Sequence, residues 1–138
     1  MTTRSFPFTP RSARELESGD IVAVPISSDA WTCLVVVELR RSGAGARTTL
    51  IAGTVDWYGT NEQAAADISE LPIVEQGLTR IELFTQDGVR VVGNIGPVST
   101  PFDSNYRDYH IGAVHQVWGW KSALQRARRR AALKRESG

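Results

Sequence analysis

Residues 19–40, GDIVAVPISSDAWTCLVVVELR, hold two apolar runs that are separated by a short polar segment. In the first run, residues 21–26, every residue except Pro25 is apolar. This run predicts a strand with both faces covered, in which Pro25 marks a strand end or a sheet edge. The second run, residues 32–40, is rich in β-branched residues and predicts another strand. Residues 27–30 between them predict a turn.

The second strand should present different side chains to the two sides of the sheet, because side chains alternate along a strand. The two predicted sets are Cys33, Val35, Val37 and Leu39 on one face, and Leu34, Val36 and Glu38 on the other. Cys33 lies inside the apolar run, so we expect a buried and unreactive thiol.

More strands and a short helix are predicted downstream. The loop at residues 41–46 is too short for a parallel crossover, so a third strand at residues 47–57 should continue an antiparallel meander. This strand should close at a rim that contains Asp56, Trp57 and Tyr58. Thr60 is a candidate helix N-cap, because Gln63 follows three residues later with the spacing of a capping box. This pattern predicts a short helix after Thr60.

The segment FTQDGVRVVGN, residues 84–94, places Asp87-Gly88 between two β-prone runs. That arrangement is typical of a type I′ hairpin and predicts strands at residues 79–86 and 89–94. From Trp118 the apolar residues follow a helical period and predict a C-terminal helix over residues 118–135. Its apolar face should carry Trp120, Leu124, Ala127 and Ala131.

These elements predict a mainly β fold with minor α. We expect a single-domain bent antiparallel sheet or half-barrel with one short middle helix and a C-terminal helix. Residues 1–14, which contain Pro7 and Pro10, should form an irregular lead-in. Residues 15–138 should form one β-rich domain that ends in a basic helix.

The composition is that of an ordinary globular domain, with 41% hydrophobic and 22% charged residues over 138 positions. A single cysteine cannot form an internal disulfide, so a reducing compartment fits best. Neither a signal-peptide segment nor a run of about 20 apolar residues is visible. We therefore expect a soluble, cytoplasmic protein that does not bind membranes.

The net charge of +1 hides an asymmetry between the body and the C-terminal end. Residues 1–120 carry nine arginines against fourteen acids, a balance of −5, whereas residues 121–138 carry seven cations against one acid, a balance of +6. A basic end of this kind can attract nucleic acid. It can equally be a solvated helix end whose cations complement the helix dipole.

Aromatic side chains with polar tips are concentrated in residues 104–120, SNYRDYHIGAVHQVWGW. Trp118 and Trp120 could anchor the terminal helix to the sheet while the tyrosines fix a long loop. The same stretch could instead present a polar and aromatic face to a partner.

Catalytic and metal-binding patterns are not found. His110 and His115 are five residues apart, which differs from the i, i+4 pair of a helical zinc site. No G-x-S-x-G elbow is present, and RSGAGAR (residues 41–47) lacks the lysine and the helix of a phosphate loop. We expect no metal, no cofactor and no enzymatic activity. A small hydrolase that uses His110 or His115 is the weakest of the possible readings.

The order of several short motifs carries a family resemblance. The opening GDIVAVPI (residues 19–26) is followed by VVVEL (35–39), then by VRVVGNIGPV (89–98) and Pro101. In this order the chain resembles the bacterial immunity protein 26 family over residues 16–102. It departs from the family pattern at residues 30–32, where Ala-Trp-Thr takes the place of a glycine-containing segment, and the C-terminal basic tail lies outside the pattern.

The resemblance implies an all-β domain without catalytic residues that neutralises a toxin delivered between competing bacteria, as part of a polymorphic toxin system. A nuclease is one candidate for the toxin, because an acidic body would attract a basic partner. The predicted partner-binding residues are Trp57, Tyr58, Asp103, Tyr106, Arg107, Asp108, Tyr109 and His110. The alternative is a small nucleic-acid-binding β-barrel that uses Lys121, Arg126, Arg128, Arg129 and Arg130.

Overall fold

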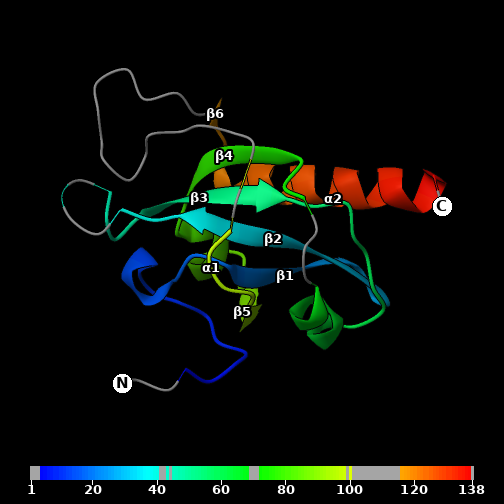
Figure 1. Cartoon of the computed structure of the whole chain (residues 1–138), viewed down its shortest axis with the longest axis horizontal. Helices are drawn as coiled ribbons and strands as arrows, with labels where there is room; N and C mark the ends of the chain where they lie inside the picture. The colour runs from blue at the N-terminus through cyan, green and yellow to red at the C-terminus, as the bar shows by residue number, and fades with distance from the viewer. Residues whose placement is uncertain are drawn as a thin grey trace.

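The computed structural model describes residues 4–40, 43, 45–68, 72–98, 100 and 116–137, with the backbone alone for Asp67 and Ser137. Six strands form one sheet (Figure 1): β1 (Asp20–Ser27), β2 (Ala30–Glu38), β3 (Thr49–Thr54), β4 (Glu75–Arg80), β5 (Arg90–Asn94) and β6 (Gln116–Val117). The helical elements are η1 (Ala13–Glu15), η2 (Glu62–Asp67), α1 (Glu82–Thr85) and α2 (Trp120–Ser137), of which η1 and η2 are 3-10 helices.

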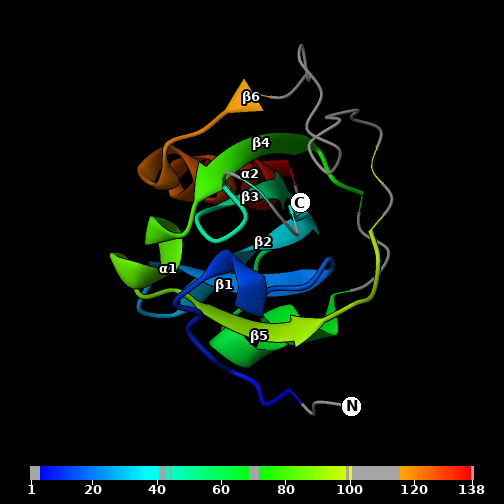
Figure 2. The ribbon, with the colours of Figure 1, turned by 90° about the vertical axis from the view of Figure 1, so that its left-hand side faces the viewer.

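The strand order is β5-β1-β2-β3-β4-β6, and the sheet is curved but not closed (Figure 2). All neighbouring strands are antiparallel except β4 and β6, which run parallel. The predicted mainly β fold with minor α is therefore confirmed. The sheet is mixed rather than purely antiparallel, because β6 comes after a long connection and adds to the sheet beside β4.

Apolar side chains cover the two faces of the sheet with two separate cores. On one face, Val22, Val24, Leu34 and Val36 pack with residues of α2 such as Leu124. On the other face, Ile21, Ala23, Cys33 and Val35 pack with residues of η2 and the segments beside it. The alternation predicted for the second strand is thus confirmed from Cys33 to Val37, and both faces of β1 are covered as expected.

One residue of that pattern was predicted on the wrong face. Leu39 belongs to the core on the α2 side, together with Leu34 and Val36. The pairing of β2 with β3 shifts register between Val36 and Glu38, and β2 ends at Glu38. An irregularity of this kind breaks the two-residue period, so alternation no longer places the next side chain.

The predicted short middle helix is present as the 3-10 helix η2, and its predicted start is off by one residue. The N-cap of η2 is Asn61 rather than Thr60, and its side chain accepts a hydrogen bond of 2.8 Å from the backbone N–H of Ala64. Thr60 and Asn61 are both able to cap, so the sequence could not separate them.

The predicted hairpin over residues 79–94 is wrong. Residues 82–85 form the short helix α1, in which the adjacent residues Leu83 and Phe84 are both buried in the core on the α2 side. Gly88 has a φ of +76°, and its N–H donates to the carbonyl of Phe84 at 2.9 Å. This glycine therefore ends a helix and is not part of a β-hairpin turn. Strand β5 then pairs with β1 rather than with β4.

The C-terminal helix α2 is seated by Trp118, which is 2% exposed. Its indole ring lies directly on the backbone of β4 at Gly77, where a Cβ atom would come within 2.4 Å of the ring. Ala123, Leu124, Ala127 and Ala131 are the buried residues that continue this contact along α2. Of the two alternatives left open for Trp118, the structure shows the anchoring role, and Trp120 packs at the margin of the same core.

Replacing Gly77 by alanine should destabilise the fold, because neither the β4 backbone nor the enclosed Trp118 ring has space to move. We expect a loss of about 1–3 kcal/mol in the free energy of unfolding, measured by urea denaturation. Gly119→Ala is the matched control, since a Cβ there meets nothing within 4 Å. Equal stabilities of the two variants would contradict the packing described for Trp118.

Candidate partner-binding rim

The rim loop, residues 55–61 between β3 and η2, is fastened to the hairpin of β1 and β2. Trp31 and Gly59 exchange two backbone hydrogen bonds, each of 2.8 Å. The hydroxyl of Thr32, a buried residue of β2, donates to the carbonyl of Trp57 at 2.7 Å. These bonds hold the loop in one conformation at the end of the sheet.

The two aromatic residues predicted for this rim have different environments. Trp57 is half-buried against the η2-side core, and its ring lies over Gly59, where a Cβ atom would come within 2.7 Å of it. Tyr58 is 42% exposed. The loop therefore uses Trp57 to hold its own shape and leaves the Tyr58 ring to solvent.

The C-terminal half of α2 completes the rim. The guanidinium of Arg130 makes two hydrogen bonds to the carboxylate of Asp56, at 2.8 and 2.9 Å, and this contact raises the pKa of Arg130. Further along α2, the guanidinium carbon of Arg135 lies 5.5 Å from the centre of the Tyr58 ring. Sequence reasoning missed Arg135, because nothing in the order of residues indicates that α2 ends beside this loop.

The cations proposed for nucleic-acid binding contact the protein's own body. Arg126 and Arg129 approach the carboxylate of Glu75 at 3.4 and 3.7 Å. Arg128 donates to the carbonyl of Pro25 at 2.9 Å, while Lys121 lies over the ring of Trp120 at 5.3 Å. With Arg130 on Asp56, all five of these side chains have contacts within the chain, although Arg129 is still 66% exposed.

Six of the predicted partner-binding residues lie outside the described residues: Asp103, Tyr106, Arg107, Asp108, Tyr109 and His110. His115 is also outside them. The structure therefore places Trp57 and Tyr58 of the predicted set and says nothing of the others.

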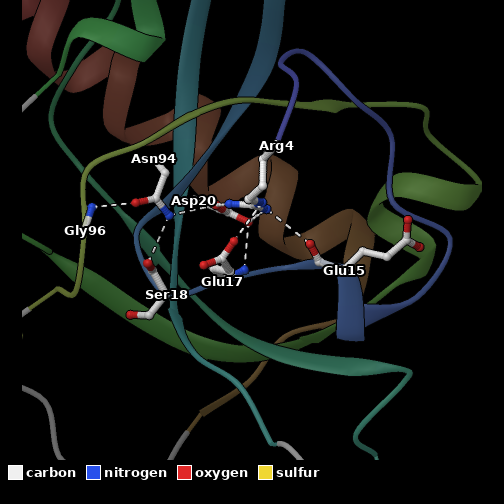
Figure 3. Close-up of polar contacts among 7 residues, drawn as sticks. All are labelled: Arg4, Glu15, Glu17, Ser18, Asp20, Asn94 and Gly96. Carbon is white, nitrogen blue, oxygen red and sulfur yellow. Dashed lines mark hydrogen bonds and ion pairs between the residues drawn. The ribbon is translucent and has the colours of Figure 1, made fainter. Parts of the chain in front are cut away.

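A second polar cluster surrounds the buried carboxylate of Asp20 (Figure 3). Arg4 donates to both carboxylate oxygens, at 2.6 and 2.7 Å, and this contact raises the pKa of Arg4. The backbone N–H of Glu17 donates to the same carboxylate at 2.8 Å, and the side-chain amide of Asn94 donates at 2.9 Å. Four donors thus satisfy two oxygens, which is the environment of a structural ion pair.

This cluster joins two motifs that are far apart in the sequence. Asp20 and Asn94 are paired residues of β1 and β5, and each follows a glycine. Gly19 has a φ of +91°, and a Cβ atom on it would come within 1.9 Å of the carbonyl oxygen of Gly96. The Gly-Asp and Gly-Asn motifs that carry the family resemblance are therefore two halves of one structural contact, which a single sequence does not reveal.

Removing the charge of Asp20 should cost stability, because the Arg4 guanidinium and the Asn94 amide would lose a buried acceptor. For Asp20→Asn we expect a loss of about 2–4 kcal/mol in the free energy of unfolding. Asp29→Asn is the control, because Asp29 is an exposed turn residue whose change should cost less than about 0.5 kcal/mol. Similar losses in both variants would show that the buried pair has no special weight.

Cys33 is enclosed in the η2-side core, and burial raises the pKa of its thiol to about 12. The thiolate is the reactive form, so the native protein should not react with a disulfide reagent such as DTNB at about pH 8. The same protein unfolded in urea should react completely. Rapid labelling of the folded protein would contradict the enclosed position of Cys33.

Within the described ranges, no group of three or more His, Cys, Asp or Glu side chains could hold a metal ion. Among the same residues, no helix combines the length and apolar character that crossing a membrane requires. Comparison with protein-family models, with curated proteins and with solved structures gives no match. The resemblance to the immunity protein 26 family therefore stays a prediction from short motifs.

Proposed function

We propose that this protein is a non-catalytic immunity protein that binds and neutralises a cognate bacterial toxin in the cytoplasm of the cell that makes it. The short motifs shared with the immunity protein 26 family support assignment to the class of immunity proteins. The rim formed by Tyr58 and Arg135 gives a surface that suits such a contact. Tyrosine, tryptophan and arginine are the residue types that contribute most to protein–protein binding energy.

The exposed ring of Tyr58 on a fastened loop is the observation that carries this proposal. Its backbone neighbours are held by the pairing of Trp31 with Gly59 and by the hydroxyl of Thr32. A ring presented in this way loses little conformational entropy when a partner covers it. Arg135 beside it adds a cation that can bind a carboxylate or a carbonyl of the partner.

The nucleic-acid alternative is less favoured, because the cations that it needs already have partners. Displacing Arg130 from Asp56, or Arg126 from Glu75, would leave a carboxylate facing the phosphates. The same contacts weaken the inference of a basic nuclease as the toxin. Asp56 and Glu75 belong to the acidic body, and both are neutralised by α2.

The test is co-expression with any toxin domain that a neighbouring gene encodes, read out as growth rescue and as the affinity of the purified pair. Tyr58→Ala should weaken binding by about tenfold or more, because an exposed aromatic anchor is removed from a fastened loop. Phe6→Ala is the matched control: Phe6 is 39% exposed, against 42% for Tyr58, and lies outside the rim. It should change affinity by less than about twofold.

Two results would count against the proposal. Failure of the wild-type protein to bind or to rescue would remove the immunity function. Rescue by wild type with equal affinities for Tyr58→Ala and Phe6→Ala would keep the function but move the contact away from the rim.

A further inference from the structure

Most arginines in the described part of the chain have a partner in that part. Arg4 pairs with Asp20, Arg80 with Glu82, Arg90 with Glu62, and Arg130 with Asp56. Three arginines differ, since Arg11, Arg14 and Arg47 are exposed and make no side-chain hydrogen bond or ion pair with another described residue.

These three arginines, which we call the arginine end, come from two segments that meet in space. The backbone N–H of Ala13, in η1, donates to the carbonyl of Arg47 at 2.8 Å. Arg11 and Arg14 therefore lie on either side of Ala13, which is hydrogen-bonded to Arg47. Figures 1 and 2 show η1 beside the connection between β2 and β3, at the end of the sheet away from the C-terminus of α2.

Both segments of the arginine end are held by local hydrogen bonds. In η1, Ser12 and Glu15 form a reciprocal capping box, and Ala13 and Leu16 are buried. Before Arg47, the carbonyl of Gly45 accepts hydrogen bonds from the backbone and hydroxyl of Thr49, at 3.0 and 2.8 Å. These contacts restrict the backbone on either side of the three arginines.

Like charges on adjoining segments repel one another, and no described carboxylate pairs with any of these three guanidinium groups to offset the repulsion. Most other arginines in the described part of the chain have a carboxylate, a carbonyl or an aromatic ring as partner, as Arg130, Arg128 and Arg135 do. We propose that the arginine end is a binding surface for an acidic polypeptide segment, whose carboxylates supply the missing partners. Guanidinium groups bind carboxylates through two parallel hydrogen bonds, which suits this class of ligand.

The surroundings favour a polypeptide over a nucleic acid. Glu15 follows Arg14 in η1, and its carboxylate accepts hydrogen bonds from the backbone N–H groups of Arg11 and Ser12 at 2.8 and 3.0 Å. The carbonyl of Thr48 accepts from Ile81 at 2.8 Å, which brings the pair of Arg80 and Glu82 to the same end. A continuous phosphate backbone would face these carboxylates, whereas a polypeptide can place its charges between them.

This surface is separate from the rim that carries the proposed toxin contact. Arg47 precedes β3 and Tyr58 follows it, so the length of that strand, about 20 Å, separates the two ends. The inference therefore stands or fails independently of the immunity function.

The experiment measures binding of a fluorescein-labelled oligoglutamate peptide by anisotropy, with an oligodeoxythymidine of equal charge as the competing class. The variant is Arg11→Gln with Arg14→Gln and Arg47→Gln. The charge-matched control is Lys121→Gln with Arg129→Gln and Lys134→Gln, three exposed cations of α2. We expect the first variant to lose about tenfold or more in peptide affinity and the control less than about twofold.

The stability of the first variant distinguishes binding from a structural role. It should unfold at the same or a higher urea concentration than wild type, because repulsion among the three cations is removed. Equal losses of peptide affinity in the two variants, tighter binding of the oligonucleotide than of the peptide, or no peptide binding by wild type would each overturn the proposal.

Discussion

The contact between the Trp118 ring and the backbone of β4 at Gly77 is the constraint on which the rest of the structure depends. A side chain at position 77 would prevent the ring from reaching the sheet. Trp118 comes directly after β6 and two residues before α2, so its position fixes both the last strand and the direction of the helix. The small residues Ala123, Ala127 and Ala131 then let α2 lie close to the strands.

The direction of α2 decides where the charges of the protein are neutralised. Its arginines extend across the sheet and meet Glu75 and Asp56, which are carboxylates of the acidic body. The opposite charges of the body and the C-terminal end are thus largely paired with each other within the protein. The same direction brings Arg135 over Tyr58 and so creates the rim. The three exposed arginines without a partner lie at the other end of β3.

Much of the scaffold could be predicted from local patterns. The covered faces of β1, the alternation in β2, the burial of Cys33 and the apolar face of α2 follow from the apolar patterns, because each of these segments is regular over several residues. The errors lie where regularity ends. Leu39 follows a bulge, and the Asp87-Gly88 signal is ambiguous because a positive φ at glycine serves a helix end as well as a hairpin.

The functional features needed distances that a single sequence does not contain. Tyr58 could be placed at a rim because it follows a strand, but its contact with Arg135 joins residues on two separate elements. Asp20 and Asn94 lie in recognisable motifs, yet their hydrogen bond depends on β5 pairing with β1. The predicted hairpin would have paired residues 89–94 with 79–86 and would have hidden this contact.

The central claim is that α2 is an integral part of the domain, held against the sheet by apolar packing and not by ion pairs alone. Hydrogen–deuterium exchange of the α2 backbone amides, compared with those of β3 and β4 at low and at high salt, tests it most directly. The account predicts that residues 123–131 exchange as slowly as the central strands. Added salt should leave this protection in place, because salt screens ion pairs and does not weaken the apolar packing of Trp118. Fast exchange in α2 while the strands stay protected, or loss of its protection at high salt, would contradict it.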